Sequence, residues 1–331
     1  MEASSPKADG LSESSAAAPQ HSAALQARRG RLGRLAGLAP LLAACLWGGM
    51  YVVSRASFDA IPPITLGLLR VIIGGLTLWL ALTLTARRAG QSSAAAQRQP
   101  GDIWRFLLLG GTLAATIITQ FWGTALASAH DGALLTTITP VFVVPIAWLL
   151  LRERPGWRVL VGTGLALAGV VIVVASNAGS GGIAGSSLLG DALLLISALC
   201  WALFTVLGAP VVRRRSALAA STYATLWSIL LLAPFVPIEL AQRHIGQITF
   251  PLVLAVLYLG WGATALAWYL WYKGVERLDA AVAAIFFFAQ PLVGGLLSAL
   301  FLGEILPPGF WLGGVVLAAG IVLASIQGKK T

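Results

Sequence analysis

Charged residues are scarce in this chain of 331 residues. Asp, Glu, Lys and Arg together make up 10 % of the sequence, whereas hydrophobic residues make up 58 %. So few charges cannot supply the polar surface that covers a water-soluble domain of this size. The mean hydropathy of +0.85 supports the same conclusion. The composition therefore excludes a water-soluble domain and predicts a protein whose solvent is the lipid bilayer.

Thiols, imidazoles and nucleotide-binding motifs are also sparse. The chain has two cysteines, Cys45 and Cys200, which lie inside apolar runs, and three histidines, which lie far apart. These positions predict neither a disulfide framework nor a metal centre. The sequence also lacks a Gly-rich loop ending in Lys-Ser or Lys-Thr, so nothing in it supports an ATP-driven pump. We expect no cofactor.

The basic residues indicate an orientation rather than a nucleic-acid partner. The net charge is +10, but most of the Lys and Arg side chains lie between hydrophobic runs. They gather in alternate connections, which is typical of the cytoplasmic face of a membrane protein. This pattern predicts that both termini are cytoplasmic. The basic clusters after the N-terminal tail are Arg87, Arg88 and Arg98; Arg152, Arg154 and Arg158; Arg213 to Arg215; Lys273 and Arg277; Lys329 and Lys330.

Ten apolar runs follow the polar N-terminal segment. Each has about 18 to 24 residues, enough to cross a hydrocarbon core as a helix. A helix is expected for each run because lipid cannot satisfy an unpaired backbone amide. The fold class is therefore an all-α integral membrane protein with ten transmembrane helices. The expected spans are 36–57, 64–85, 105–127, 132–151, 157–176, 189–211, 217–238, 251–272, 280–303 and 309–327.

The two halves of the chain are related by an internal repeat. The stretch from Ala133 to Glu153 recurs in looser form 151 positions later. A shift of 154 positions aligns the starts of the two halves. Each half has five spans, an odd number, so the second half must enter the membrane upside down. The aligned pairs include Gly123 and Gly274, Pro140 and Pro291, Glu153 and Glu304, Gly162 and Gly313, Gly169 and Gly320, and Trp47 and Trp201.

This repeat divides the chain into four parts. Residues 1–34 are rich in Ser and Ala without apolar periodicity, which predicts a disordered cytoplasmic tail. Residues 35–176 and 189–328 are the two five-helix repeats, in inverted orientation. Residues 177–188, mostly Gly, Ser and Ala, form a linker that we expect outside the cell.

Three sequence features together resemble a known family. They are the opening LAACLWGGMYVVSR, the pairing of Pro63 with Arg70 in the second span, and the copies ending in TPVFVVPIAWLLLRE and QPLVGGLLSALFLGE. The chain resembles the drug/metabolite transporter superfamily, specifically bacterial proteins with two EamA domains, over residues 36–327. One departure is that Leu-Arg-Glu ends the first copy, where the family usually has the Leu-Gly-Glu found in the second.

The resemblance implies a function as well as a fold. It implies a secondary carrier in the bacterial plasma membrane, with a central cavity lined by both halves. Members of the family export amino acids and many other metabolites, so the resemblance does not select a substrate.

Arg70 is the most informative single residue. It lies about six residues into the second span, where a guanidinium group should not face lipid. We expect it to face a cavity and to bind a carboxylate or another anion. The alternative is that it snorkels outward or ties helices together through backbone carbonyls. Arg55, near the outer end of the first span, has the same two interpretations.

Aromatic and amide side chains at depth complete the predicted substrate site. Trp47 and Trp201 occupy equivalent positions in the middle of their spans, and Trp261 lies seven residues before Trp268, on the same face of an ideal helix. They are expected either to line the cavity or to pack between helices. The candidate amides are Gln120 and Gln290, which either line the cavity or bond a neighbouring helix.

Two pairs of repeat-related residues are candidates for hinges or gates. Pro140 and Pro291 each remove a helical hydrogen bond at matched depth, which suits either a hinge or a static kink. Glu153 and Glu304 end matched helices at opposite faces. A carboxylate there either caps the amides of the following helix or serves as a gate or proton-coupling group.

Small residues recur at a spacing that favours close helix packing. They are Gly164 and Ala168 in the fifth span and Gly314 and Ala318 in the tenth. Packing inside the bundle is the preferred interpretation, and a homodimer interface is the alternative.

These patterns predict export of amino acids or similar small amphipathic metabolites by alternating access. The partners are the small-molecule substrate and the lipid bilayer. No carboxylate lies at mid-membrane depth, so facilitated export, exchange or coupling through an interfacial group is expected rather than a buried proton relay. The alternative is uptake or exchange of another organic anion or a nucleobase-like metabolite. A membrane-embedded enzyme is the remaining class, although polar catalytic groups do not cluster at either interface.

Overall fold

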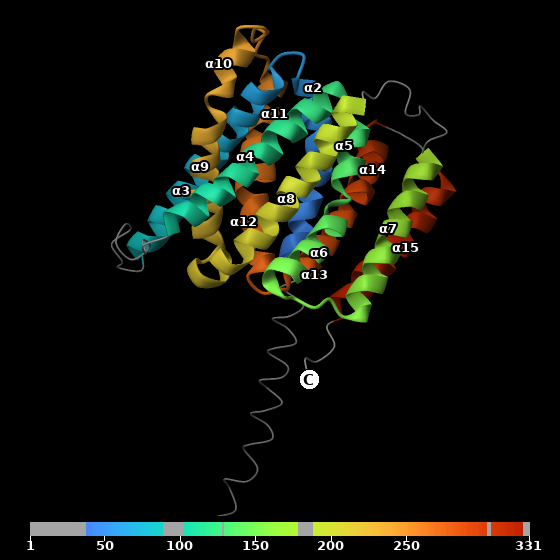
Figure 1. The fold of residues 1–331 in the computed structure, drawn as a ribbon. Helices are drawn as coiled ribbons and strands as arrows, with labels where there is room; N and C mark the ends of the chain where they lie inside the picture. Colours follow the sequence, from blue (N-terminus) through green and yellow to red (C-terminus); the bar gives the residue numbers. More distant parts are fainter. Residues whose placement is uncertain (1–37, 89–101, 128, 178–187, 303–305, 327–331) are drawn as a thin grey trace, which may run out of the picture.

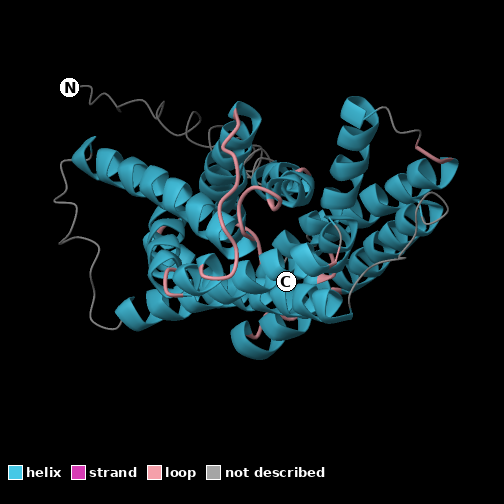
Figure 2. Ribbon diagram, turned by 90° about the horizontal axis from the view of Figure 1, so that it is seen from above, coloured by secondary structure: helices cyan, strands magenta, loops and turns pink. Residues whose placement is uncertain are grey.

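The computed structural model of the protein is a bundle of helices (Figure 1). It describes residues 38–88, 102–127, 129–177, 188–302 and 306–326, so the predicted tail and most of the linker fall outside the described residues. Helices joined by loops and turns account for this part of the chain, and it contains no strand (Figure 2). The all-helical expectation is therefore confirmed for the described residues.

The helices of the first half begin with the span Leu38–Ser57, whose last part is α2 (Met50–Ser57). The others in this half are α3 (Pro63–Arg88), α4 (Asp102–Leu126), α5 (Ala129–Thr136), α6 (Thr139–Leu151) and α7 (Trp157–Asn177). Those of the second half are α8 (Leu188–Arg215), α9 (Ala217–Leu232), α10 (Phe235–Leu240), α11 (Phe250–Leu257), η2 (Tyr258–Leu266), α12 (Ala267–Val275), α13 (Ala280–Ile285), η3 (Phe286–Phe288), α14 (Ala289–Leu302) and α15 (Pro308–Ser325).

Seven helices within the described residues are long and apolar enough to cross a bilayer. Three shorter apolar helices, Thr139–Leu151, Trp157–Val173 and Ala217–Leu232, fall in the remaining predicted spans. Many large apolar side chains point outward, including Trp79, Leu149 and Leu300, as expected of a surface that faces lipid. The count of ten transmembrane helices stays a prediction.

The end of the bundle at which α3 and α8 finish is called the basic end. The last turns of these helices carry Arg87 and Arg88 and the run Arg213 to Arg215. Cationic side chains in the last turn of a helix are stabilised by the partial negative charge of its carbonyl groups.

The fourth span of each half is interrupted just before the proline that the repeat aligns with its equivalent in the other half. In the first half α5 ends at Thr136 and α6 begins at Thr139, so Pro140 is the second residue of α6. In the second half the 3-10 turn η3 separates α13 from α14, and Pro291 is the third residue of α14. Proline is accommodated in a first helical turn because that turn has no preceding carbonyl to bond. Both prolines therefore mark breaks in a span rather than kinks inside one helix.

The two helices α7 and α15 pack side by side at one edge of the bundle (Figure 1). A Cβ atom added to Gly169 would lie 2.6 Å from Gly313 O, and one added to Gly162 would lie 2.7 Å from Gly320 O. Because Gly162 aligns with Gly313 and Gly169 with Gly320, these contacts are reciprocal between the repeats. Such reciprocity is what an approximate two-fold axis between the halves produces.

The predicted packing residues Gly164 and Ala168 do not make this contact. Both are exposed, and a Cβ atom on Gly164 would meet nothing within 4 Å. Ala318 is exposed as well, whereas Gly314 faces Leu292 of α14. The packing face lies instead one or two residues away, because the close approach of the two backbones selects the glycines at 162, 169, 313 and 320.

A second reciprocal contact joins the halves near their first helices. A Cβ atom on Gly123 would lie 2.8 Å from Leu194 Cγ, and one on its equivalent, Gly274, would lie 2.7 Å from Pro40 Cδ. Leu194 and Pro40 are themselves 154 positions apart, the shift that aligns the starts of the halves. Each half therefore supplies its third helix to the first helix of the other, and the central space is enclosed by both.

Candidate functional site

A narrow cavity lies at the centre of the bundle, between the two halves. Its volume is about 20 Å³, which is room for about one water molecule. It is lined by Trp47, Met50, Tyr51, Arg70, Leu113, Thr116, Ile117, Gln120, Thr136, Thr139, Ser197, Ala198, Trp201, Trp268, Phe287 and Gln290. Five of the seven predicted substrate-binding residues are in this group: Arg70, Trp47, Trp201, Gln120 and Gln290.

Arg70 places a cation on the cavity wall. Its side chain is 2 % exposed and extends from α3 toward the π-helical segment η2. Arg70 Nε donates to Thr264 Oγ1 at 2.9 Å, and Nη1 lies 3.0 Å from Met50 Sδ. No ion pair with a carboxylate is recorded for it among the described residues. The guanidinium group is thus oriented by a neutral hydroxyl and a thioether, and its charge is not neutralised by an acid there.

Aromatic rings lie over the Arg70 guanidinium group and contribute to its stability. Arg70 Cζ is 5.3 Å from the ring centroid of Phe121 and 5.6 Å from that of Trp268. The negative face of an aromatic ring attracts a cation, and the attraction grows when water is excluded. These rings provide partial compensation for burial but leave Nη2, which bonds no described residue, available to a ligand.

Gln290 and Trp201 carry polar atoms without partners beside the cavity. Gln290 is 1 % exposed, and neither its Oε1 nor its Nε2 bonds another described residue. The same is true of Trp201 Nε1. A buried donor or acceptor that stays unpaired is destabilising by about 1 to 3 kcal/mol, so such groups usually serve a ligand or water. Both side chains line the cavity, which makes it the place where that ligand would bind.

The aromatic wall of the cavity is built from both repeats. Trp47 and Trp201 meet edge to face with ring centroids 5.1 Å apart, and Phe287 lies 5.2 Å from Trp47. Trp47 Nε1 donates to Ala263 O of η2 at 2.9 Å, so this indole is held in place. Trp47 therefore both packs and lines the cavity, and the two interpretations offered for it are compatible.

A chain of hydrogen bonds forms another side of the cavity. Gln120 Nε2 donates to Tyr51 Oη at 2.8 Å, and Tyr51 Oη lies 2.6 Å from Thr136 Oγ1. Thr136 Oγ1 in turn donates to Gly132 O at 2.6 Å. Gln120 thus bonds a neighbouring helix while lining the cavity, and the chain fixes the wall beside the break between α5 and α6.

Two predicted substrate-binding residues lie away from the cavity. Trp261 is 54 % exposed on the outer surface, and Arg55 is exposed near the end of α2. The prediction that Trp261 and Trp268 share one helix face was wrong, because Trp261 lies in the π-helical segment η2. A π turn holds about one residue more than an α turn, and each added residue rotates the preceding part of the helix by about 100°. Of these two residues, only Trp268 lines the cavity. Arg55 is exposed and does not line the cavity, and the snorkelling interpretation stays a prediction.

Sequence reasoning missed several lining residues that lie one turn from predicted ones. Tyr51 follows Trp47 by four positions, Thr116 precedes Gln120 by four, and Ser197 precedes Trp201 by four. Residues four apart share a helix face, so the period of the α-helix could have identified them. Phe287 lies three residues before Gln290 but in the 3-10 turn η3, which no sequence signal indicated.

The hinge and gate candidates occupy different places. Pro140 and Pro291 follow the breaks described above, next to the lining residues Thr139 and Gln290. Glu153 lies at the basic end, and Glu304 lies outside the described residues. The hinge and gate roles themselves stay predictions.

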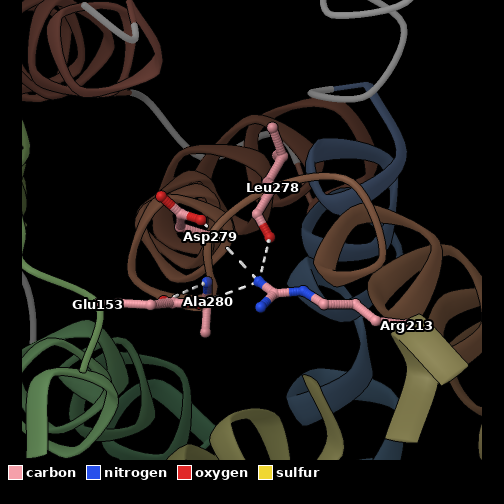
Figure 3. A network of polar contacts seen from close by, with 5 residues as sticks. All are labelled: Glu153, Arg213, Leu278, Asp279 and Ala280. Atoms are coloured by element: carbon pink, nitrogen blue, oxygen red, sulfur yellow. Dashed lines mark hydrogen bonds and ion pairs between the residues drawn. The ribbon is translucent and has the colours of Figure 1, made fainter. Parts of the chain in front are cut away.

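Glu153 joins the two halves through a polar network (Figure 3). Its Oε2 accepts from the backbone N of Ala280 at 3.1 Å, and its Oε1 bonds Arg213 Nη2 at 3.0 Å. Arg213 also donates to Leu278 O at 3.3 Å and approaches Asp279 Oδ1 at 3.9 Å. A capping role for Glu153 was expected at the following helix, α7. Instead Glu153 binds the start of α13, because packing brings the second half against the end of α6.

The sequence of this helical bundle matches a known class of membrane protein. The sequence model of the EamA-like transporter family matches residues 34–175 and again residues 188–326. The chain belongs to the EamA-like transporter family. An EamA-like chain is a multi-pass membrane protein and a transporter, so the superfamily expected from the sequence is confirmed.

Relatives of this EamA-like chain carry transporter names. The uncharacterized transporter YetK of Bacillus subtilis is 31 % identical over 64 % of each chain. The uncharacterized transporter YwfM of the same organism is 26 % identical over 90 % of this chain and 96 % of its own. A probable terminal-alkyne amino-acid exporter of Streptantibioticus cattleyicolor is 28 % identical over 82 % of this chain and 90 % of its own.

A solved crystal structure shares the fold of this EamA-like transporter. It superimposes with a TM-score of 0.73 and 23 % sequence identity, covering 88 % of this chain and 99 % of the other. At this identity the similarity is evidence for the fold alone. The family and its relatives' names indicate a transporter rather than an enzyme.

Proposed function

We propose that the protein is a secondary carrier that exports amino acids or similar small amphipathic metabolites across the bacterial plasma membrane. In this proposal residues 35–176 and 189–328 are two inverted repeats of five transmembrane helices, and both termini are cytoplasmic. The repeats rock about the central cavity, which opens to each side of the membrane in turn.

The Arg70 side chain carries the proposal. It is a buried guanidinium group on the cavity wall, with no carboxylate partner among the described residues. Burying a charge is costly unless it is paired, and a planar guanidinium fork matches a carboxylate with two parallel hydrogen bonds. A substrate carboxylate would supply the missing partner during transport.

The remaining lining residues suggest how the rest of such a substrate is held. Gln290 offers both an acceptor and a donor, and Trp201 offers a donor, with no partner in the described residues. These groups suit the amino end or another polar group of the substrate. Trp47, Trp268 and Phe287 form an apolar surface that suits a side chain.

The size of the cavity implies that the halves move during transport. A volume of about 20 Å³ is far below the 300 to 1,000 Å³ typical of ligand pockets, so the cavity must open before a metabolite enters. The breaks before Pro140 and Pro291 lie beside the lining residues and are the proposed hinges. The Glu153–Arg213 network joins the halves at the basic end and is the proposed cytoplasmic gate.

Coupling to protons through the cavity is not favoured. The lining residues include no Asp or Glu, so the cavity wall within the described residues offers no buried carboxylate relay. Facilitated export or exchange is the preferred mode. The relative named a probable terminal-alkyne amino-acid exporter supports the choice of substrate class by analogy.

The test is uptake of labelled amino acids, aromatic and aliphatic, into proteoliposomes with and without a pH gradient. We expect saturable uptake that Arg70→Ala abolishes. Arg55→Ala is the matched control, because it removes the same charge from an exposed position off the cavity. Unchanged uptake by correctly inserted Arg70→Ala protein would remove the binding role of Arg70.

A second candidate function is uptake or exchange of another organic anion or a nucleobase-like metabolite. The same unpaired Arg70 favours an anion without requiring an amino group. Competition against the labelled substrate by carboxylates without an amino group, and by uncharged nucleobases, separates the two functions. Amino-acid export predicts competition only by compounds that carry both groups.

A further inference from the structure

A second and larger cavity lies at the basic end of the bundle. Its volume is about 440 Å³, and it is bounded by the ends of α3, α8 and α12 and by the starts of α4 and α9. None of its lining residues belongs to the central cavity. It is lined by Leu82, Thr85, Ala86, Phe106, Arg214, Arg215, Ser216, Ala217, Leu218, Ala219, Tyr223, Tyr269 and Lys273.

The polar part of this cavity is cationic. Arg214, Arg215 and Lys273 line it, and the lining residues include no carboxylate. Lys273 Nζ bonds Glu276 Oε2 at 3.0 Å, whereas Arg214 is exposed and no ion pair is recorded for it among the described residues. Two of the three cations come from the last turn of α8, so their side chains share one helix end.

The first turn of α9 adds to the positive potential. Ser216 precedes α9 and its hydroxyl accepts from Ala219 N at 3.3 Å. The other amides of that turn have no carbonyl partner within the helix, and together they carry a partial positive charge. This 16-residue helix therefore begins in the same cavity that holds the three cationic side chains.

Apolar side chains also line the cavity. Leu82 and Phe106 are buried, and the ring of Phe106 packs against Tyr223 with centroids 4.9 Å apart. A cavity lined by both cationic side chains and buried apolar groups matches an amphiphile. It lies at the ends of apolar helices, the depth at which lipid headgroups meet a membrane protein.

We propose that this cavity binds an anionic phospholipid, with its phosphate held by Arg214, Arg215 and Lys273 and its glycerol and upper acyl chain against Leu82 and Phe106. The proposal does not depend on the transported substrate. A soluble phosphate would use the same cations but would gain nothing from the apolar lining residues, which is why the lipid is the favoured source.

Native mass spectrometry of the purified full-length chain tests this proposal. The probes are phosphatidylglycerol and phosphatidylcholine with identical acyl chains, and a further arm adds inorganic phosphate. The wild type should retain one phosphatidylglycerol in preference to phosphatidylcholine, and phosphate should not displace it. Arg214→Gln with Arg215→Gln should weaken this binding by about tenfold or more, since each basic side chain near a lipid surface contributes about 1 kcal/mol.

The matched control is Arg152→Gln with Arg154→Gln. It removes two exposed charges from the same end of the bundle but outside the cavity, and should leave phosphatidylglycerol binding unchanged. The first double variant changes two residues at the end of α8 and could disturb that helix. The single substitution Arg214→Glu, at an exposed position, therefore provides a second test of phosphatidylglycerol binding. Equal loss in the control, equal binding of both lipids, or unchanged binding by Arg214→Glu would overturn the proposal. Displacement by phosphate would assign the cavity to a soluble anion instead.

Discussion

Trp47 and Trp201 meet edge to face, with ring centroids 5.1 Å apart, although 154 positions separate them in the sequence. They are equivalent residues of the two repeats, and only residues close to an approximate two-fold axis can contact their own equivalents. The central cavity lies beside this pair. The proposed substrate site is therefore at the interface of the repeats, as is usual for carriers built from inverted repeats.

The two indoles differ in their hydrogen bonds, which leads to a first prediction. Trp47 Nε1 donates to Ala263 O, whereas Trp201 Nε1 has no partner among the described residues. We expect Trp47→Phe to lower the free energy of unfolding by about 1 kcal/mol more than Trp201→Phe does, because only the former leaves a buried carbonyl unpaired. Thermal unfolding of both variants in detergent measures the difference. Equal destabilisation would contradict it, since both substitutions remove the same volume.

Thr264 orients the guanidinium group of Arg70 and gives a second prediction. Its hydroxyl accepts from Arg70 Nε at 2.9 Å and donates to Leu259 O at 2.7 Å. Thr264→Val keeps the shape but removes the acceptor. We expect KM for a carboxylate substrate to rise about 3- to 10-fold with little change in kcat, which corresponds to one lost hydrogen bond.

Thr225→Val is the control for Thr264→Val. Thr225 is equally buried and its hydroxyl also bonds a backbone oxygen, that of Ser221, but it does not bond Arg70. The KM of Thr225→Val for the carboxylate substrate should equal that of the wild type. A similar rise in both variants would indicate a general packing effect rather than orientation of Arg70.

The Glu153 network gives a third prediction. Glu153→Gln removes the ion pair with Arg213 and weakens the bond to the start of α13, so the basic end should open more often. The measurement is labelling of Ser197→Cys on the cavity wall, in a background with Cys45→Ala and Cys200→Ala. An impermeant thiol reagent is added to the side that the basic end faces. We expect Glu153→Gln to be labelled at least about threefold faster.

Glu276→Gln controls for the loss of an ion pair at the same end. It breaks the bond between Lys273 and Glu276, which lies within one helix end and does not join the halves. Its labelling rate should equal that of the parent. Equal rates for Glu153→Gln and the parent would remove the gate role and leave Glu153 as a helix cap.

The contact between α7 and α15 gives a fourth prediction. A Cβ atom on Gly169 would lie 2.5 Å from Leu317 N and 2.6 Å from Gly313 O, which are backbone atoms that cannot rotate away. We expect Gly169→Ala to lower the free energy of unfolding by about 1 to 3 kcal/mol, the range for overpacking. Gly164→Ala, which adds the same methyl group where nothing lies within 4 Å, should be neutral or slightly stabilising. Thermal unfolding compares them, and equal effects would contradict the contact.

The extent of several helices was accessible from the sequence to within a few residues. The expected span 64–85 corresponds to α3 at Pro63–Arg88, and 157–176 corresponds to α7 at Trp157–Asn177. In lipid each apolar run must satisfy its own backbone amides, so its helical state follows from local sequence. The burial of Arg70 was predictable for the same reason, because a charge at that depth is not stable against hydrocarbon.

Residues that depend on local irregularity could not be predicted. Trp261 and Trp268 share a face of an ideal α-helix, but the π-helical segment η2 turns Trp261 outward. The same segment presents Thr264 to Arg70 and Ala263 O to Trp47. No periodicity in the sequence indicates a π turn, because its stability comes from contacts with α3 and with the first helix.

The sequence by itself determined that this is an apolar, repeated, helical membrane protein, because hydrophobicity and backbone hydrogen bonding in lipid act within each span. Only the tertiary structure decided which side chains meet. It placed Glu153 on α13 rather than on the following helix, left the polar atoms of Gln290 and Trp201 unpaired beside the cavity, and selected Gly169 instead of Gly164 for close packing. These choices depend on contacts between residues more than a hundred positions apart, which no local pattern encodes.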